Sequence, residues 1–270
     1  MAFVSSGKTR IFWNERGAGT PVVLVMGHRY SSAMWYPVLD YLAARHRVIW
    51  YDNRGTGQSG RSANVSITDF VNDTLAVMDA AGIAKAHVFG VSMGGGIVLE
   101  MSRTHAERMN SMILGCTCAL TPDKPRTKAW MRALYFLPPF ILKALMKPKV
   151  ANKGYGSMAP LDGVKRDLAV LAKDPFSVRG VHAQAVAISK YSIERDAVKN
   201  IQVPALVMHG DEDAAVPYAW GVELAELLPH SEFVHLRGAG HNYLVAAPDQ
   251  SQKAITEFLD RMDTQAPVPA

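Results

Sequence analysis

The chain has 270 residues, of which 49% are hydrophobic and 20% are charged, and its formal net charge is +5. This composition is that of an ordinary globular protein, long enough for one large α/β domain with an insertion. No apolar stretch reaches the ~18 residues of a membrane span, and residues 1–13 lack the apolar core of a signal peptide. We therefore expect a cytoplasmic protein without stable membrane insertion.

The cysteines and the basic residues carry little functional signal. Cys116 and Cys118 are one residue apart, which makes a mutual disulfide strained, and no further soft ligands lie at the spacing of a zinc site. We expect both to be packing residues of a reduced protein. Basic residues gather in one segment without a nucleic-acid recognition motif, so we expect a solvated basic face and no nucleic-acid partner. This basic patch comprises Lys124, Arg126, Lys128, Arg132, Lys143, Lys147, Lys149 and Lys153.

The first part of the chain predicts strands that alternate with helices. Apolar patterning and turn residues predict an edge strand at 9–15, a buried strand at 21–26, an amphipathic helix at 35–45 and a strand at 46–51. The polar loop at 52–59 has neither the dinucleotide nor the P-loop spacing, so we expect it to support the rim of a site structurally.

The next segment predicts a helix, a strand and a tight turn. Ser66 and Asp69 resemble a capping box, and helical spacing then continues to a stop at Gly82. A buried strand from His87 runs into Gly90-Val91-Ser92-Met93-Gly94. This Gly-x-Ser-x-Gly pattern is typical of a nucleophile elbow, a strained strand-to-helix turn that lifts the serine hydroxyl to the top of a sheet. The Met93 amide would lie at the positive end of the following helix, where an oxyanion is stabilised.

The alternation predicts a mostly parallel sheet with helices on both faces and a site at the carboxyl ends of its strands. After a strand at 109–116, the segment from 118 to 196 reads as helices only, at 130–146 (interrupted at Pro138-Pro139), 161–173 and 178–191. We expect an all-helical cap inserted after strand 6. The predicted division is residues 1–117 as the first part of the core, 118–196 as the cap and 197–270 as the second part of the core.

The last segment supplies candidates for an acid and a base. Its predicted elements are a strand at 203–210, a helix at 219–228, a strand at 232–236 and a helix at 248–262. Three carboxylates follow the first of these strands, and Asp213 lies far enough past Gly210 to turn inward. His241 lies on a glycine-rich loop just past a strand end and is the favoured base, with His209 as its competitor.

Three motifs of the chain resemble those of the α/β-hydrolase fold superfamily, and the resemblance extends over residues 9–262. The motifs are Gly90–Gly94, Gly210–Asp213 ahead of Pro217, and Gly240-His241. The resemblance implies an α/β fold with Ser92, His241 and Asp213 as a catalytic triad, Asp213 standing at the last position of Gly-x-x-Asp. By position, the backbone amide of His28 would join that of Met93 in an oxyanion hole. The family loop commonly reads His-Gly-x, whereas this chain has Met26-Gly27-His28. We expect the His28 side chain to hydrogen-bond nearby backbone.

The resemblance also narrows the chemistry. A serine at position 92 argues against dehalogenases and epoxide hydrolases, and Asn242 stands where carbon–carbon hydrolases usually carry tryptophan. Ser92–Gly95 and Asn53–Gly57 are similar to segments of enol-lactonases and cofactor-free perhydrolases. We expect a serine hydrolase that cleaves carboxylic esters through an acyl-enzyme, with no cofactor or metal. Lactone, carbon–carbon and perhydrolase chemistry and a small-molecule receptor remain alternatives. The expected partner is a small ester or lactone, and the chain would be a monomer or homodimer.

Overall fold

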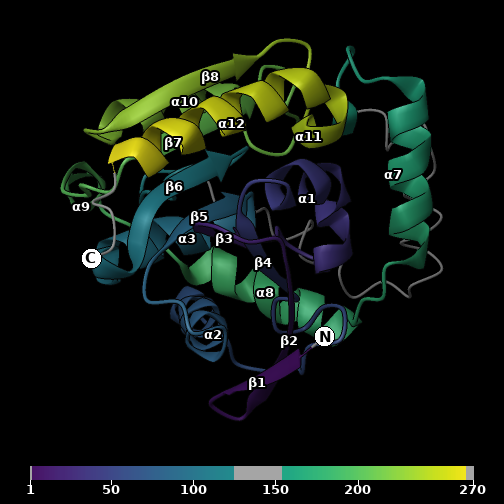
Figure 1. Cartoon of the computed structure of the whole chain (residues 1–270), viewed down its shortest axis with the longest axis vertical. Coiled ribbons are helices and arrows are strands. Elements are labelled where there is room, and N and C mark those ends of the chain that lie inside the picture. Colours follow the sequence, from purple (N-terminus) through teal and green to yellow (C-terminus); the bar gives the residue numbers. More distant parts are fainter. Residues whose placement is uncertain (1, 125–153, 266–270) are drawn as a thin grey trace.

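The computed structural model describes residues 2–124 and 154–265, and its centre is one eight-stranded sheet. The strand order is β1-β2-β4-β3-β5-β6-β7-β8 (Figure 1). The strands are β1 (Ala2–Ser6), β2 (Thr9–Arg16), β3 (Pro21–Val25), β4 (Arg47–Tyr51), β5 (Ala86–Val91), β6 (Met109–Gly115), β7 (Ala205–Gly210) and β8 (Ser231–Leu236).

The sheet is parallel from β4 to β8 and antiparallel at its β1–β2 end. β2 pairs antiparallel with β4 on one side and with β1 on the other, where Ala2 lies opposite Trp13. The strand predicted at 9–15 is confirmed as β2, but its prediction as the edge strand is wrong, because β1 forms that edge. The five residues of β1 form a short segment whose burial alternates, which leaves a weak apolar signal in the sequence.

Helices cover both faces of the sheet, as predicted. α1 (Tyr36–Ala43) and α12 (Pro248–Gln265) pack on one face, while α2 (Ile67–Ala80), α3 (Met93–Thr104) and α10 (Tyr218–Leu227) pack on the other. Two large buried clusters, one on each face, form the core. The capping box of α2 is confirmed, since Ser66 and Asp69 bond reciprocally to each other's backbone amides.

The sheet and its helices define the α/β-hydrolase fold that the sequence predicted, with a helical insertion after β6. The described part of this insertion contains α7 (Leu161–Lys173), α8 (Val178–Lys190) and α9 (Arg195–Lys199). α7 stands away from the sheet, next to α11 (Tyr243–Ala246) (Figure 1). The helix expected at 130–146 lies outside the described residues, and the exact domain boundaries remain a prediction.

At one point, the backbones of the insertion and the core approach each other through two glycines. Gly55 lies in the loop after β4, and Gly180 lies in the first turn of α8. A Cβ at Gly55 would be 2.8 Å from the Gly180 Cα, and a Cβ at Gly180 would be 2.3 Å from the Gly55 carbonyl oxygen. The two backbones therefore touch with no side chain between them.

The described residues include one member of the basic patch, Lys124. Lys124, the first residue of the basic patch, is buried and forms an ion pair with Glu223, so the prediction of a solvated face is wrong for this residue. The other members of the patch lie outside the described residues. Among the helices of the described ranges, none has the length and apolar character to cross a bilayer.

Candidate active site

Ser92 lies at a strained turn between β5 and α3. Its backbone angles are φ 54° and ψ −119°, a conformation that an L-residue adopts only when its surroundings enforce it. The surroundings are crowded because a Cβ at Gly90 would be 2.4 Å from the Gly94 carbonyl oxygen, and one at Gly94 would be 2.0 Å from that of Val25. The geometry is that of the expected nucleophile elbow.

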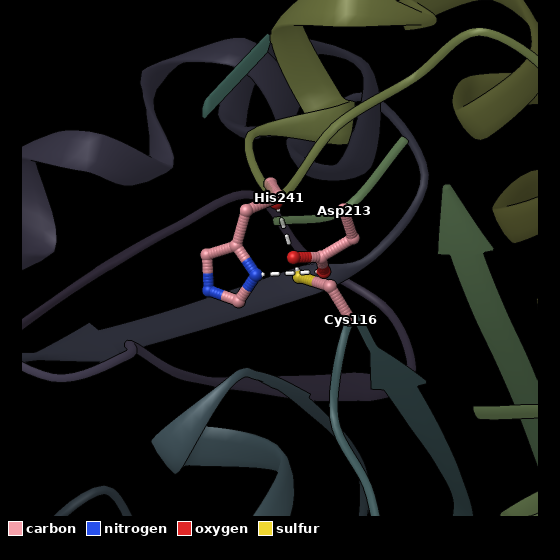
Figure 2. A group of neighbouring side chains, drawn as sticks. All are labelled: Cys116, Asp213 and His241. Atoms are coloured by element: carbon pink, nitrogen blue, oxygen red, sulfur yellow. Dashed lines mark hydrogen bonds and ion pairs between the residues drawn. The ribbon is translucent and has the colours of Figure 1, made fainter. Parts of the chain in front are cut away.

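Asp213 and His241 meet above the carboxyl ends of β7 and β8 (Figure 2). His241 Nδ1 lies 2.8 Å from Asp213 Oδ2. A carboxylate only accepts, so Nδ1 carries the proton and Nε2 is left as the basic nitrogen of the neutral ring. The other oxygen, Oδ1, accepts from the backbone amides of Ala215 (2.7 Å) and Val216 (2.9 Å), which fixes the carboxylate.

Burial and neighbouring groups shift the pKa values of both Asp213 and His241. Burial alone would raise the pKa of Asp213, but hydrogen bonds from His209 and His241 hold it well below its ordinary value. Burial alone would lower the pKa of His241, but the Cys116 sulfur and the negative Asp213 raise it well above 6.5. The pair therefore favours an imidazole that accepts a proton readily.

His209, the competing base, has a different position. Its side chain is fully buried, and its Nε2 lies 3.0 Å from the Val216 carbonyl oxygen and 3.3 Å from Asp213 Oδ2. A carbonyl only accepts, so this nitrogen is a donor. His209 therefore supports the carboxylate from behind and does not line the cavity that contains Ser92.

The two acids next to Asp213 are exposed, and their side chains bind neighbouring loops. Asp211 accepts from the Gly238 amide (2.7 Å) and pairs with His235 (2.9 Å), which braces the loop that carries His241. Glu212 accepts from the backbone amide (2.7 Å) and hydroxyl (2.5 Å) of Ser157, in the insertion.

The loop after β3 runs beside Ser92. A Cβ at Gly27 would be 3.2 Å from the Ser92 Cβ, so His28, the following residue, also lies next to the predicted nucleophile. The His28 side chain bonds to backbone, as expected, although its partner is distant in sequence: Nε2 donates to the Val181 carbonyl at 2.9 Å. Burial lowers the pKa of His28 to about 4, so the ring is neutral.

The loop at 52–59 supports this region, as expected. Asp52 Oδ1 accepts from the backbone amide (2.8 Å) and the hydroxyl (2.6 Å) of Ser32. Asn53 Nδ2 donates to the Met26 carbonyl at 2.7 Å. These bonds anchor both ends of the loop that contains Gly27 and His28.

Cys116 contributes to the site more directly than a packing residue would. It follows β6 with φ 38°, and its thiol donates to the His241 carbonyl at 3.1 Å (Figure 2). Cys116, Asp213 and His241 offer possible metal-ligand atoms within 4.8 Å of one another. An ion bound there would break the His241–Asp213 hydrogen bond, so the arrangement suits an acid–base pair better than a metal centre.

Ser92, His28 and His241 line one cavity, together with mostly apolar side chains and with Asp167 from α7. Sequence reasoning did not single out Asp167, because one acid on an amphipathic helix resembles a solvated charge. Ser92 also lines a second, mostly apolar cavity, together with residues that include Met93, Thr117 and Leu120.

The chain belongs to the α/β-hydrolase fold family. The family model described as "alpha/beta hydrolase fold" matches residues 20–154, and a second model, described as "TAP-like protein", matches residues 186–268.

The names of individual relatives refer to several different reactions. A protein of Azorhizobium caulinodans that carries the name carbamate hydrolase RutD is 28% identical, covering 97% of this chain and 100% of its own length. The pimeloyl-[acyl-carrier protein] methyl ester esterase of Aliivibrio fischeri is 25% identical, with coverage of 94% and 98%. The solved enol-lactonase of Burkholderia xenovorans LB400 has a TM-score of 0.80 and 25% identity, with coverage of 96% and 100%. These names support a hydrolase and differ in the bond that is cleaved.

Proposed function

We propose that the protein is a serine hydrolase that cleaves carboxylic esters with Ser92 as nucleophile, His241 as general base and Asp213 as its orienting acid. The observation that carries the proposal is the His241–Asp213 bond of 2.8 Å at a cavity that also contains the strained Ser92. A neutral imidazole with Nδ1 bonded to a fixed carboxylate has its other nitrogen available to take the serine proton.

The reaction proceeds in two acyl-transfer steps. Ser92 Oγ attacks the ester carbonyl while His241 Nε2 takes the hydroxyl proton, and the backbone amides of His28 and Met93 bind the resulting oxyanion. The intermediate collapses, and His241 gives the proton to the leaving alcohol. Water, deprotonated by the same nitrogen, then attacks the acyl-enzyme carbonyl. When this second intermediate collapses, the bond to Ser92 Oγ breaks, His241 returns the proton to Ser92, and the acid is released. The same two amides bind the oxyanion of this second tetrahedral intermediate.

Carbamate cleavage on the same three residues is the second candidate, favoured by the relative that carries that name over nearly the whole chain. Nitrogen donation makes a carbamate carbonyl less electrophilic than an ester carbonyl, so this reaction depends more strongly on the oxyanion donors. Lactone cleavage is the third, supported by the enol-lactonase likeness. It follows the ester mechanism, except that the alcohol remains attached to the released acid.

The test is turnover of p-nitrophenyl butyrate and of the isosteric p-nitrophenyl N-ethylcarbamate by the wild type and four variants. Ser92→Ala and His241→Ala should reduce kcat/KM at least about 10³-fold, and Asp213→Asn somewhat less. His230→Ala, at an exposed histidine, is the matched control and should retain activity.

Each result leads to a different assignment. A faster carbamate than ester reaction, lost with Ser92→Ala, would assign the second candidate. A caprolactone added as a third substrate tests the lactone reading. Absence of turnover on all three, together with no labelling of Ser92 by a fluorophosphonate, would refute a serine hydrolase. Labelling without turnover would favour the receptor alternative.

A further inference from the structure

A carboxylate lies in the wall of the cavity that contains Ser92 and His241. Asp167 comes from α7 of the insertion and is 2% exposed, yet it lines this cavity. The other walls are mainly apolar, with Met26, Met34, Pro37, Val91, Leu244 and Val245 among the lining residues. Asp167 is therefore an ionisable group in an otherwise apolar part of a substrate site, and it has no role in the acyl-transfer steps.

Two tyrosines fix this carboxylate. The Tyr36 hydroxyl donates to Oδ1 at 2.9 Å, and the Tyr155 hydroxyl donates to Oδ2 at 2.7 Å. Tyr36 begins α1 of the core, whereas Tyr155 precedes α7, so both the core and the insertion hold the carboxylate. Each oxygen has accepted one hydrogen bond and retains a second lone pair. The group is thus oriented in advance and still able to accept.

Within the described ranges, Asp167 has no cationic partner, and its polar contacts are the two tyrosine hydroxyls. Burial raises the pKa of Asp167 above its ordinary value, and the two tyrosine hydrogen bonds oppose this shift because they favour the ionised carboxylate. Arg166, the preceding residue, stacks over the Tyr36 ring, with its guanidinium carbon 4.9 Å from the ring centroid. A buried charge that is only partly compensated binds a further N–H or O–H donor favourably and repels a second negative charge. His28, which shares the cavity, is neutral and offers no positive charge to offset it.

We propose that Asp167 is a specificity-determining subsite, which binds a hydroxyl, amide or amine donor on the substrate and rejects a substrate with a carboxylate at that position. The proposal rests on the hydrolytic function proposed for Ser92. It predicts substrates that carry a neutral or cationic donor group a few atoms from the scissile carbonyl. A substrate that lacks the donor leaves the carboxylate desolvated and is processed more slowly.

The test compares three end groups at constant chain length, on each side of the scissile bond. The acyl series is p-nitrophenyl heptanoate, 6-hydroxyhexanoate and the adipate monoester. The alcohol series is hexyl acetate, 5-hydroxypentyl acetate and 5-acetoxypentanoate. In one of the two series, the wild type should prefer the hydroxyl over the methyl end at least about tenfold in kcat/KM, and the carboxylate should be the poorest substrate.

Asp167→Asn removes the charge and keeps the shape, so it should reduce the hydroxyl preference about tenfold and raise activity toward the carboxylate end. Asp162→Asn is the matched control on the same helix, since the Asp162 side chain is 99% exposed, and it should leave all the ratios unchanged. If Asp167→Asn fails to fold, the wild-type series still tests the proposal, because equal activity on the three ends would overturn it without the variant.

Equal activity on the three ends in both series, with turnover that still requires Ser92, would overturn the subsite and leave the hydrolase intact. The same conclusion would follow if a hydroxyl preference persisted unchanged in a folded Asp167→Asn variant. Absence of Ser92-dependent turnover on every substrate would instead refute the proposed function, and the subsite with it.

Discussion

His241 is the residue whose protonation would decide the rate. Its side chain is 20% exposed, and burial alone would lower the pKa of the ring. Contact with Asp213 has the opposite effect, and the pKa of Asp213 is held so low that the carboxylate stays charged over the whole range in which His241 titrates. The group of the pair that titrates is therefore His241, and its pKa lies above the ordinary value of 6.5.

This coupling predicts the pH profile. A general base acts only when it is unprotonated, and the pKa of His241 is raised, so kcat/KM should increase with pH through a midpoint above 6.5. Asp213→Asn removes the charge that favours the imidazolium, so the midpoint should move to lower pH while the plateau falls about 10³–10⁴-fold.

The measurement is kcat/KM on p-nitrophenyl butyrate from pH 5 to 9.5. Asp249→Asn, at an exposed acid of α12, should reproduce the wild-type curve. A wild-type midpoint at or below 6.5, or a midpoint that Asp213→Asn leaves in place, would contradict the coupling.

Hydrogen bonds join the insertion to the loop after β3. Besides the His28 bond to Val181, the Arg29 amide donates to Gln184 Oε1 at 2.9 Å, and the Ser31 amide donates to Asp174 at 3.0 Å. Arg29 has φ 79°, which these bonds help to maintain. The loop that supplies the proposed His28 oxyanion donor is thus held by α8 and the residues before it.

Gln184 positions the loop after β3. Its side chain is fully buried, and its Nε2 also donates to the Arg54 carbonyl at 3.0 Å. Gln184→Ala should lower kcat by about 10–100-fold with little change in KM, since a displaced amide loses contact chiefly with the transition state. Arg179→Ala, at an exposed residue of the same helix, is the control. A raised KM with unchanged kcat would indicate that Gln184 shapes only substrate binding.

The sequence predicted regular elements well where local signals were strong. The helix at 161–173 has the predicted bounds, and the capping box placed the start of α2 correctly. Short elements were missed, namely β1, α9 and α11, because four to five residues carry too little periodicity. The contacts of Asp167, Gln184 and Cys116 could not be predicted either, because they join segments that only the tertiary structure brings together.

At the level of the whole molecule, a buried ion pair links the polar loop to the core. Arg54 donates to both oxygens of Asp73 on α2, at 2.7 and 2.6 Å, and Asp73 is fully buried. The same Arg54 accepts the Gln184 bond through its carbonyl. A continuous set of contacts therefore runs from α2 through the loop at 52–59 to the insertion.

Removing one partner of this ion pair should destabilise the protein more than replacing both partners with apolar residues. Arg54→Met leaves a buried carboxylate unpaired and should lower the free energy of unfolding by about 3–5 kcal/mol, whereas Arg54→Met with Asp73→Leu should recover much of the loss. Urea denaturation measures both. Asp196→Asn, which breaks an exposed pair with Lys199, should change stability by less than about 1 kcal/mol. Equal losses in the single and double variants would contradict this account.

The contact between Gly55 and Gly180 limits how the insertion can be exchanged. A designer who grafts the insertion of another hydrolase onto this sheet would have to supply a residue without a side chain opposite Gly55, because any Cβ there meets main-chain atoms. Matching the shape or polarity of the two surfaces would not be sufficient. Besides the hydrogen bonds that join core and insertion, their compatibility thus requires glycine at both of these positions, and a side chain at either one would push the two backbones apart.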